Sequence, residues 1–315
     1  MSRKIILDVD TGIDDSLAVL TAAVSIRVDL VGCTTTWGNV DVETATRNTA
    51  ALLELAEIDG VPVAAGAAGP LNGAAPGYAR HVHGDDGQGG HALDLDGVPV
   101  SGETAAELII RLSHEHAGEL HLVAVGPLTN LALALEADPT LPERVPEVTI
   151  MGGAFGVPGN ITPVAEANII GDPEAAQRVI DAAWSCTFVG LDVTMEHLLT
   201  EEHRAQLNAG GEIGRHCGAI LDHYFDFYAD VTGTRCAANH DALALGVACG
   251  KAALGLAPTV RMQIDTTDGP GRGQTIADRR PMYEGWPTPR GARHRIALEV
   301  DEGYTDWMVQ LLAAA

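Results

Sequence analysis

The sequence predicts an α/β protein with an open, mostly parallel sheet, helices on both faces and a small antiparallel extension near the C-terminus. Short β-branched segments alternate with longer segments in which apolar residues recur at helical spacing. The predicted strands are almost continuous apolar runs, which is typical of parallel strands covered on both faces. We find no linker and no internal repeat in the 315 residues, and we therefore expect a single domain over residues 1–315.

The alternation starts at the N-terminus. KIILDVD (4–10) is the first predicted strand, and DDSLAVLTAAV (14–24) is a helix with Asp14 or Asp15 at its N-cap. The later strands are VDLVGCTTTW (28–37), ELHLVAV (119–125), PEVTIMGG (146–153) and SCTFVGLDV (185–193). The later helices are 42–58, 127–137, with Pro127 in its first turn, and 172–183. This order predicts a Rossmann-like sheet, in which ligand sites lie beyond the carboxyl ends of the strands.

Two segments interrupt the alternation. Residues 66–102 are rich in Gly, Pro, His and Asp, and because loops of this length are usually functional, we expect a loop on the substrate side. Residues 262–300 combine turn signals with short alternating runs, which predicts the antiparallel extension. Residues 301–315 predict a closing amphipathic helix. The candidates for its packed side are Trp307, Val309 and Leu311.

Composition limits the possible partners and compartments. Nineteen Lys and Arg residues against 43 Asp and Glu residues give a net charge of −24, which argues against a nucleic-acid or anionic-membrane partner. Asp8 interrupts the first apolar run before a signal-peptide core could form, and no run approaches the ~20 residues of a membrane helix. We expect a cytoplasmic protein. The five scattered cysteines contain no CxxC pair and predict buried thiols, not disulfides or a zinc site.

The stretch DVDTGIDD places Asp8, Asp10, Asp14 and Asp15 directly after the first strand. Gly12 allows a turn that brings the two pairs together. Because clustered carboxylates repel one another, the whole cluster favours a hard divalent cation, calcium or magnesium. For any single aspartate, a role as a helix cap or a solvated strand end is the better interpretation. For the four aspartates as a cluster, cation binding is the better interpretation.

Three other interpretations can be compared with this stretch. An EF-hand loop counted from Asp8 fails, because Ile13 and Val19 occupy the glycine and glutamate positions. A phosphatase of the haloacid-dehalogenase type would use Asp8 as nucleophile in a DxDx(T/V) motif, but Gly12 replaces the threonine or valine. That alternative stays open, as does a non-catalytic binding protein that keeps the cation pocket.

Six segments in order resemble the inosine-uridine preferring nucleoside hydrolase family. They are DVDTGIDDSLAVL, TTTWGNV, HVHGDDG, LVAVGPLTN, MGGAFGVPGNITPVAEANIIGDPEAA and NHDALA. The resemblance implies one catalytic domain with the sheet described above, bound Ca²⁺, and hydrolysis of the N-glycosidic bond of a small-molecule ribonucleoside to ribose and free base. It further implies an inosine and uridine or a pyrimidine preference, and a homo-oligomer, dimer or tetramer.

The resemblance also assigns residues to roles. The calcium ligands would be the side chains of Asp10, Asp15 and Asp241 and the backbone carbonyl of Val125, which stands where the family has threonine. The substrate-binding residues would be Asp14, Asn39, His83, Met151, Asn160, Glu166, Asn168 and Tyr228. Asp10 would act as the general base, and His240, directly before a metal-binding aspartate, as the acid that protonates the leaving base.

Some assignments stay open at this point. HVHG contains His81 as well as His83, and we favour His83 because the family has HG at that place. Tyr224 and Tyr228 are four residues apart and share a helix face, so core packing competes with contact to the base. Gln88 stands where the family usually has leucine. The preferred nucleobase does not follow from the sequence.

Overall fold

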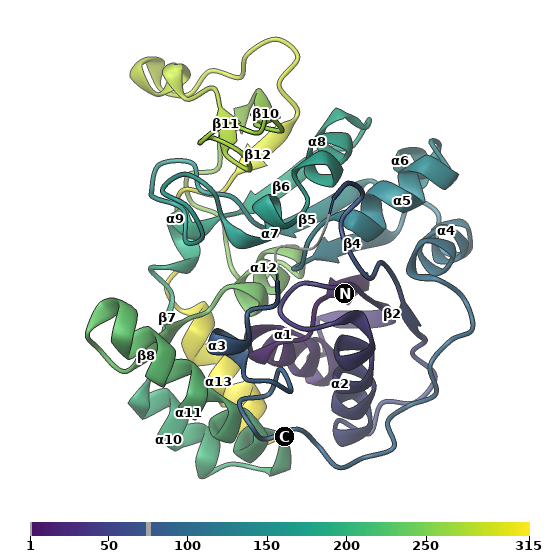
Figure 1. Ribbon diagram of the computed structural model, residues 1–315, viewed down its shortest axis with the longest axis vertical. Helices are drawn as coiled ribbons and strands as arrows, with labels where there is room; N and C mark the ends of the chain where they lie inside the picture. The colour runs from purple at the N-terminus through teal and green to yellow at the C-terminus, as the bar shows by residue number, and fades with distance from the viewer. Residues whose placement is uncertain (1, 74–76) are drawn as a thin grey trace.

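The computed structural model describes residues 2–73 and 77–315, and its central element is an eight-stranded sheet (Figure 1). In spatial order the strands are β3 (Val63–Ala65), β2 (Val28–Thr35), β1 (Arg3–Val9), β4 (Leu120–Ala124), β5 (Glu147–Met151), β6 (Cys186–Val189), β12 (His294–Ile296) and β9 (Thr259–Val260). All neighbours are parallel except β12 and β9. The predicted open, mostly parallel sheet is confirmed.

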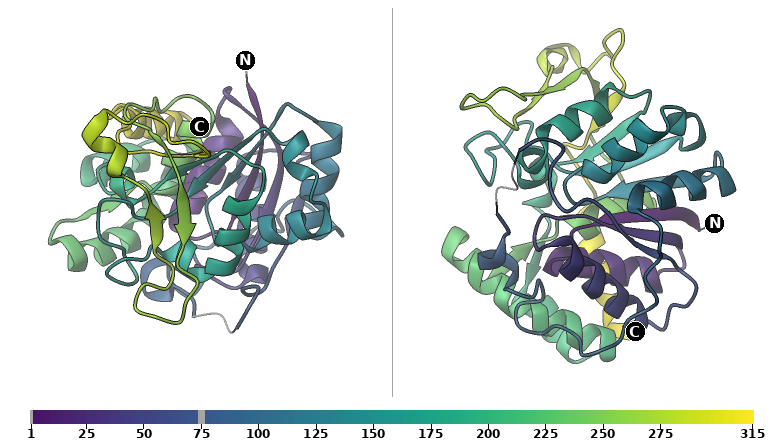
Figure 2. Two further views of the ribbon diagram at one scale, coloured as in Figure 1. Left: turned by 90° about the horizontal axis from the view of Figure 1, so that it is seen from above. Right: turned by 45° about the vertical axis from the view of Figure 1, so that its right-hand side comes forward.

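Helices cover both faces of the sheet, as Figures 1 and 2 show. The helices are α1 (Ile13–Val24), α2 (Val42–Leu55), α3 (Arg80–His83), α4 (Ala105–Glu115), α5 (Thr129–Ala137), α6 (Leu141–Arg144), α7 (Ala167–Gly171), α8 (Pro173–Asp181), α9 (Leu191–Thr194), α10 (Glu201–Asn208), α11 (Glu212–Thr232), α12 (Asp241–Ala248) and α13 (Tyr304–Ala314). Successive residues of β1 point to opposite faces, so Ile5 and Leu7 enter one core cluster and Ile6 the other.

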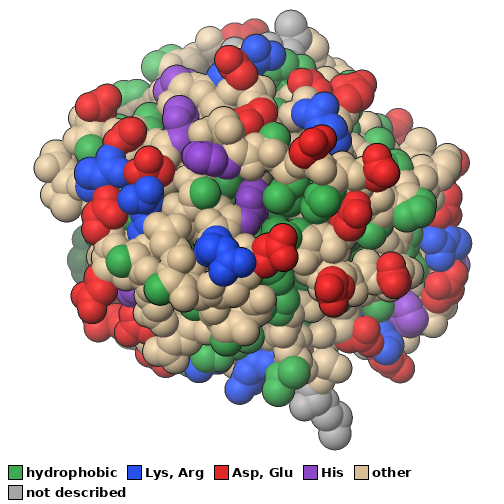
Figure 3. All heavy atoms as spheres, turned by 90° about the horizontal axis from the view of Figure 1, so that it is seen from below, with side chains coloured by type: hydrophobic (Ala, Val, Ile, Leu, Met, Phe, Trp, Pro, Cys, Tyr) green, Lys and Arg blue, Asp and Glu red, His purple; other side chains and the backbone are tan. Residues whose placement is uncertain are grey.

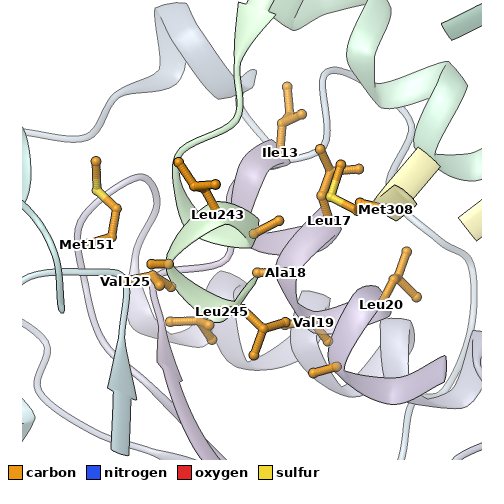
Figure 4. Close-up of a cluster of buried hydrophobic side chains, with 14 of the residues drawn as sticks. Ile13, Leu17, Ala18, Val19, Leu20, Val125, Met151, Leu243, Leu245 and Met308 are labelled. Carbon is orange, nitrogen blue, oxygen red and sulfur yellow. The ribbon is translucent and has the colours of Figure 1, made fainter. Parts of the chain in front are cut away.

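Helices α1 and α12 pack side by side in one of these clusters (Figure 4). Leu17 and Ala18 of α1 lie there near Leu243 and Leu245 of α12. Helix α1 begins just after the carboxyl end of β1, and the first residue of α12, Asp241, lies close to Asp14 and Asp15 in the first turn of α1. Acidic residues in their first turns are therefore brought together by apolar packing further along the helices.

The starts of two helices differ from the sequence prediction. Helix α1 has Gly12 at its N-cap, so the prediction of Asp14 or Asp15 there was wrong. Asp15 lies one turn in, where its side chain accepts hydrogen bonds from the amides of Gly12 and Asp10 and so still satisfies free N–H groups at the helix start. Helix α5 begins at Thr129 because Leu128 is its N-cap, so Pro127 precedes the first turn.

The closing helix α13 is present, with a different packed face. Val309 is buried as predicted, but Trp307 and Leu311 are only half-buried. The side chains packed most deeply are Tyr304, Thr305, Met308 and Leu312. The stripe starting at Tyr304 has i, i+4 spacing, because α13 is enclosed by α1, α10 and α11 and that arrangement selects its inward face.

The C-terminal segment forms the predicted antiparallel extension and also contributes to the main sheet. Strands β10 (Met262–Ile264) and β11 (Thr275–Ala277) form a hairpin, followed by the 3-10 helix η1 (Arg280–Glu284). This part projects at the top of Figure 1. Strand β12 lies within the same predicted segment but pairs with β6 of the main sheet. A second short antiparallel pair joins β7 (Leu198–Thr200) and β8 (Cys236–Ala238).

The cysteine and membrane expectations can be compared with the structure directly. All five cysteines are buried and unpaired, as predicted. Among the described residues, no helix has the length and apolar character needed to cross a bilayer.

Candidate active site

A cavity of about 590 Å³ lies at the carboxyl edge of the sheet and collects most of the predicted site residues. Because β1, β2, β4 and β5 run parallel, the loops that follow them meet at this edge. The predicted residues that line the cavity are Asp14, Asn39, His83, Val125, Met151, Asn160, Glu166, Asn168, Tyr228, His240 and Asp241. Asp10 and Asp15 are buried next to them and do not form its wall.

The carboxylates form a compact buried group. Asp14, Asp15 and Asp241 each offer an oxygen, and these oxygens lie within 4.8 Å of one another. Burial, followed by the charge of Asp14, raises the pKa of Asp15 to about 7 and that of Asp241 well above its ordinary value. The Oδ1 atoms of Asp10 and Asp14 are buried without any hydrogen-bond partner. Unpartnered acidic oxygens of this kind are the donors that a hard divalent cation requires.

Asp10 is held rigidly between two glycine-containing loops. Its Oδ2 accepts a 2.7 Å hydrogen bond from the amide of Asn39, and burial and the neighbouring charge of Asp15 raise its pKa well above the ordinary value. A Cβ at Gly126 would lie 2.8 Å from Oδ1 of Asp10, and a Cβ at Gly38 would overlap Oδ2. Both positions need glycine because the backbone approaches the carboxylate so closely.

Gly12 is needed for a different reason from the one predicted. Its φ of −92° is accessible to any residue, so the turn itself does not require glycine. A Cβ at this position would instead lie 2.6 Å from Nδ1 of His83 and 2.8 Å from Nδ2 of Asn39. The same Nδ2 donates a 2.9 Å hydrogen bond to Oδ2 of Asp15. The absence of a side chain at Gly12 therefore leaves room for His83 and Asn39, whose hydrogen bonds fix the loop that carries Asp14 and Asp15.

The two histidines of HVHG have different surroundings. His83 is 4% exposed, and its Nδ1 accepts a 3.1 Å hydrogen bond from the amide of Ile13 and lies 3.8 Å from Oδ1 of Asp14. Burial lowers its pKa to about 3, so the ring is neutral and carries its proton on Nε2. His81 is exposed and packs edge-on against Phe227. The geometry favours His83 as the residue that contacts a ligand near Asp14.

A hydrogen-bonded chain forms the opposite end of the cavity. The hydroxyl of Tyr228 lies 2.7 Å from Nε2 of His240, and Nδ1 of His240 lies 2.8 Å from Oγ1 of Thr194. Burial lowers the pKa of His240, and the charge of Asp14 partly opposes this. Tyr224 packs edge-on against Tyr228 and donates a 3.2 Å hydrogen bond to Oδ2 of Asp14. Both tyrosines therefore combine packing with polar contacts at the site.

The loop after β5 is tied down by its own polar side chains. Glu166 caps α7 and accepts hydrogen bonds from the amides of Gly153, Asn168 and Ile169, while burial raises its pKa. The side chain of Asn168 donates a 2.7 Å hydrogen bond to the carbonyl of Val125. Asn160 accepts one from the amide of Ala167. These contacts place Asn160, Glu166 and Asn168 along one wall.

The sequence analysis missed several residues that support the site. Thr194 is fully buried against His240, and no local pattern marks it. Gln88 is 2% exposed: its Nε2 donates a 2.8 Å hydrogen bond to Oγ of Ser16, and its Oε1 lies 3.3 Å from Nε2 of His216 on α11. The only sign of this role in the sequence was that Gln88 stands where the family usually has leucine. Gln88 joins the carboxylate loop to the helix that carries both tyrosines.

The outer part of the cavity is apolar. Its wall includes exposed side chains of Val157, Ile161, Met195 and Val231, between 37% and 61% accessible. Phe227 lies beside them. Apolar side chains exposed together at a cavity mouth are typical of a binding surface for a flat, weakly polar group.

Asp8 does not belong to the cavity. It is fully buried, and its Oδ1 accepts hydrogen bonds from Oγ1 of Thr34 at 2.5 Å and Nδ2 of Asn130 at 2.8 Å. Burial raises its pKa to about 7. A nucleophile must reach its substrate, and this carboxyl group faces the core. The phosphatase alternative, which depended on Asp8, is wrong on this geometry.

Known proteins share the sequence pattern of this chain over most of its length. The family model described as inosine-uridine preferring nucleoside hydrolase matches residues 5–305. The chain belongs to this family. It is 34% identical to the inosine-uridine preferring nucleoside hydrolase of Leishmania major over 96% of this chain and 94% of that protein. It is 41% identical to uridine nucleosidase 1 of Arabidopsis thaliana over 72% and 67%, respectively.

Solved structures of nucleoside hydrolases share the fold. A plant nucleoside hydrolase superposes with a TM-score of 0.93 at 32% identity and covers all of both chains. The predicted family, fold and enzyme class are confirmed: the protein is a ribonucleoside N-glycosyl hydrolase that acts on small-molecule nucleosides.

Proposed function

We propose that this nucleoside hydrolase cleaves inosine and uridine, depends on Ca²⁺, and uses Asp10 as general base and His240 as the source of the proton for the leaving base. One observation carries the proposal. Buried carboxylates, among them Asp10 and Asp14 with unpartnered oxygens, gather at one end of a cavity, and a hydrogen-bonded histidine and tyrosine close the other. The names of the Leishmania and Arabidopsis relatives support inosine and uridine as substrates.

The residues present fit a calcium ion. Carboxylate and carbonyl oxygens are the ligands that calcium takes, and Asp10 keeps a buried oxygen with no other partner. Asp10, Asp15, Asp241 and the carbonyl of Val125 would hold the ion. A bound calcium would supply positive charge that neutralises the carboxylates, acidifies water and orients the ribose hydroxyls.

The sugar would be held by residues from several loops. Asp14, Asn39 and Asn168 lie nearest the carboxylate group, where they can bind the ribose diol. Glu166 and Asn160, further along the loop after β5, would bind the remaining hydroxyl, and Met151, which lines the same cavity, would pack beneath the ring. Holding the sugar in one orientation converts binding into rate acceleration.

The general base acts on the attacking water. Oδ1 of Asp10 has no hydrogen-bond partner, whereas Oδ2 is fixed by the amide of Asn39. A water next to Oδ1 loses a proton to it and attacks the anomeric carbon as the bond to the base breaks. Positive charge then develops on the ribose ring, next to the carboxylate group. Fixed negative charge in a dry site stabilises that transition state.

The proton for the base comes through Tyr228. Both ring nitrogens of His240 are engaged, Nδ1 with Thr194 and Nε2 with the tyrosine hydroxyl. When His240 is an imidazolium, its Nε2 proton moves to the oxygen of Tyr228 while the tyrosine proton moves to the departing base. His240 is left neutral with its proton on Nδ1, and this N–H can donate a hydrogen bond to Oγ1 of Thr194. His83 and the apolar mouth surround the base meanwhile.

One assay tests the proposal. Purified protein is given inosine, uridine, cytidine, adenosine and guanosine separately, and reducing sugar is followed over time. We expect ribose from inosine and uridine, loss of activity with a chelator, and recovery with calcium. A nucleoside monophosphate should release no phosphate. Full activity after exhaustive chelation, or no ribose from inosine and uridine, would contradict the proposal.

A further inference from the structure

The loop between β5 and α7, residues 152–166, carries Asn160 and Glu166, yet over these residues, which the structure describes in full, it forms no helix and no strand. A loop of this kind must find partners for its buried backbone groups elsewhere. The amides of residues 153–156 each donate to a side-chain oxygen. In order, the acceptors are Oε2 of Glu166, Oγ1 of Thr275 and the two carboxylate oxygens of Asp192. The start of the loop is therefore held largely from outside.

Thr275 of β11 pairs both backbone groups of Ala154. Its Oγ1 accepts a 3.0 Å hydrogen bond from the amide of Ala154 and donates a 2.9 Å one to the carbonyl of the same residue. The side chain is 5% exposed. The preceding residue, Gly153, has a φ of +88°, which favours glycine, and a Cβ there would lie 3.0 Å from Cγ2 of Thr275. Both the hydroxyl and the methyl group of Thr275 thus fit against the loop backbone.

Residues 272–279, which we call the β11 segment, make contacts at both ends of the loop. Arg279 donates a hydrogen bond to the carbonyl of Phe155, directly after Ala154. Gln274 forms an antiparallel bridge with Ala165, directly before Glu166. The segment therefore contacts the loop next to its first held residues and next to its last.

The β11 segment is itself fixed to the two helices that follow the loop. Nη2 of Arg272 lies 2.9 Å from each carboxylate oxygen of Glu174 in α8. Gly273 has a φ of +81°, and a Cβ there would lie 2.7 Å from Cβ of Ile170 in α7. An ion pair and a close backbone approach thus hold the segment in place, so its contacts can position the loop.

The carboxyl group of Glu166 depends on the same part of the loop. It is 2% exposed, and its Oε2 accepts a 3.0 Å hydrogen bond from the amide of Gly153, the neighbour of Ala154. A shift of Ala154 would move that amide, and hydrogen bonds weaken steeply when their geometry is disturbed. Asn160 lies between the two held ends of the loop. The positions of both side chains in the cavity wall are therefore linked to Thr275 and Arg279.

Charge favours a neutral partner at this wall. Acidic side chains are spread over the face seen in Figure 3, and the chain carries a net charge of −24. Glu166 adds a carboxyl group at the wall itself. A carboxylate can accept a hydrogen bond from a hydroxyl, whereas it repels a phosphate. A free 5′-hydroxyl is therefore the group that suits this part of the cavity.

We propose that Thr275 and Arg279 are positioning residues: by holding residues 154 and 155 they place Asn160 and Glu166 against the 5′-hydroxyl, and so make the enzyme select nucleosides in which this hydroxyl is free. Neither Thr275 nor Arg279 lines the cavity, so both act through the loop. The inference rests on the proposed function, in which Asn160 and Glu166 bind that hydroxyl.

The test compares uridine with 5′-deoxyuridine, which lacks only this hydroxyl. The measured quantity is the ratio of the two kcat/KM values, in which the fraction of folded enzyme cancels. We expect the wild type to favour uridine at least ~10-fold. Thr275→Val keeps the shape of the side chain without its hydroxyl and should lower the ratio at least ~3-fold. Thr275→Ser should restore most of it, and Arg279→Met, which removes one donor, should lower it less.

Thr149→Val is the matched control. Thr149 lies on β5 and is 2% exposed, and its hydroxyl lies 2.8 Å from Nε2 of His121 at a hollow separate from the nucleoside cavity. This variant should keep the wild-type ratio. Glu166→Gln should lower the ratio directly, because it changes the group that binds the hydroxyl.

The outcomes separate this inference from the proposed function. If Glu166→Gln lowers the ratio and Thr275→Val does not, the inference is wrong and the proposed function stands. A wild-type ratio near one would overturn both the role of Glu166 and the inference. If the wild type cleaves neither nucleoside, the proposed function is wrong, and calorimetric binding of ribose and 5-deoxyribose to the same variants decides the inference: equal effects of Thr275→Val on both sugars would overturn it.

Discussion

The two ends of the nucleoside cavity are built on different physical principles. The carboxylate end is buried and polar: backbone amides fix Asp10 and Asp15, and the backbone at two glycines lies close to Asp10. The base end is apolar and partly exposed, with one hydrogen-bonded chain through Tyr228, His240 and Thr194. The carboxylate end is suited to fixing one sugar and the base end to accepting more than one base. We expect substitutions at the first end to abolish activity and those at the second to modulate it.

The largest effect should follow from removing the general base. Asp10→Asn keeps the size of the side chain but cannot accept a proton, so kcat should fall by at least ~10³-fold. Initial rates with inosine and uridine measure this. Asp8→Asn is the control, because Asp8 lies two residues earlier, in β1, and faces the core, and activity should be largely kept. An Asp10→Asn enzyme with normal turnover would end the proposed role.

Removal of the acid should have a smaller and substrate-dependent effect. His240→Ala should slow hydrolysis of inosine or uridine by about 10²-fold to 10³-fold, a typical contribution of general acid catalysis. p-Nitrophenyl riboside should be far less affected, since its leaving group needs no proton. Thr194→Val should act in the same direction more weakly, because it removes only the contact to Nδ1. Equal losses on both substrates would count against the proton relay.

His216, the partner of Gln88 on α11, should make the free energy of unfolding depend on pH. Burial, followed by the charge of His91, lowers the pKa of His216 from 6.5 to about 4. Between those values the unfolded chain binds a proton that the folded ring does not, so stability falls as pH falls. The loss should reach about 2 to 3 kcal/mol between pH 7 and pH 4.

Urea unfolding at several pH values measures this dependence. The variant His216→Gln, which can still donate to Gln88, should flatten the slope by that amount. The matched control is His114→Gln, because the side chain of His114 is 61% exposed. An unchanged slope in His216→Gln would show that the ring is free to charge in the fold.

The hydrogen bonds that Gln88 makes to Ser16 and His216 should affect catalysis more than folding. Gln88→Leu removes the hydrogen bonds to Ser16 and His216 and leaves the hydroxyl of Ser16 with its bond to the carbonyl of Gly12. We expect kcat to fall by about 10-fold, the equivalent of one or two hydrogen bonds, with KM little changed. Gln88→Glu, which keeps an acceptor for His216, should recover part of the loss. A fall in thermal stability without any change in kcat would assign Gln88 a structural role alone.

The smallest effects should come from the apolar mouth. Val231→Ala and Ile161→Ala remove exposed apolar surface at the base end, so KM should rise by less than ~5-fold, within the range expected for a partly buried side chain. The ratio of purine to pyrimidine efficiency should shift while kcat for p-nitrophenyl riboside stays constant. A large fall in kcat would mean that the mouth also positions the sugar.

Much of the fold followed from local pattern. Apolar runs such as KIILDVD identified the parallel strands because a strand covered on both faces has few places for polar residues. Helix boundaries were less accurate: Gly12, not Asp14 or Asp15, caps α1, since cap geometry depends on backbone angles that composition does not encode. The packed face of α13 was also misjudged, because three surrounding helices select it.

The sequence by itself determined the family, the parallel sheet and the acidic loop, because these depend on the order of residues along short segments. Only the tertiary structure decided that Asp8 faces the core while Asp14, Asp15 and Asp241 converge, since that depends on how α1 and α12 pack. It also brought Thr194 to His240 and Gln88 to His216, from segments 46 and 128 residues apart. Contacts between distant segments follow from packing of the whole chain, and no local pattern records them.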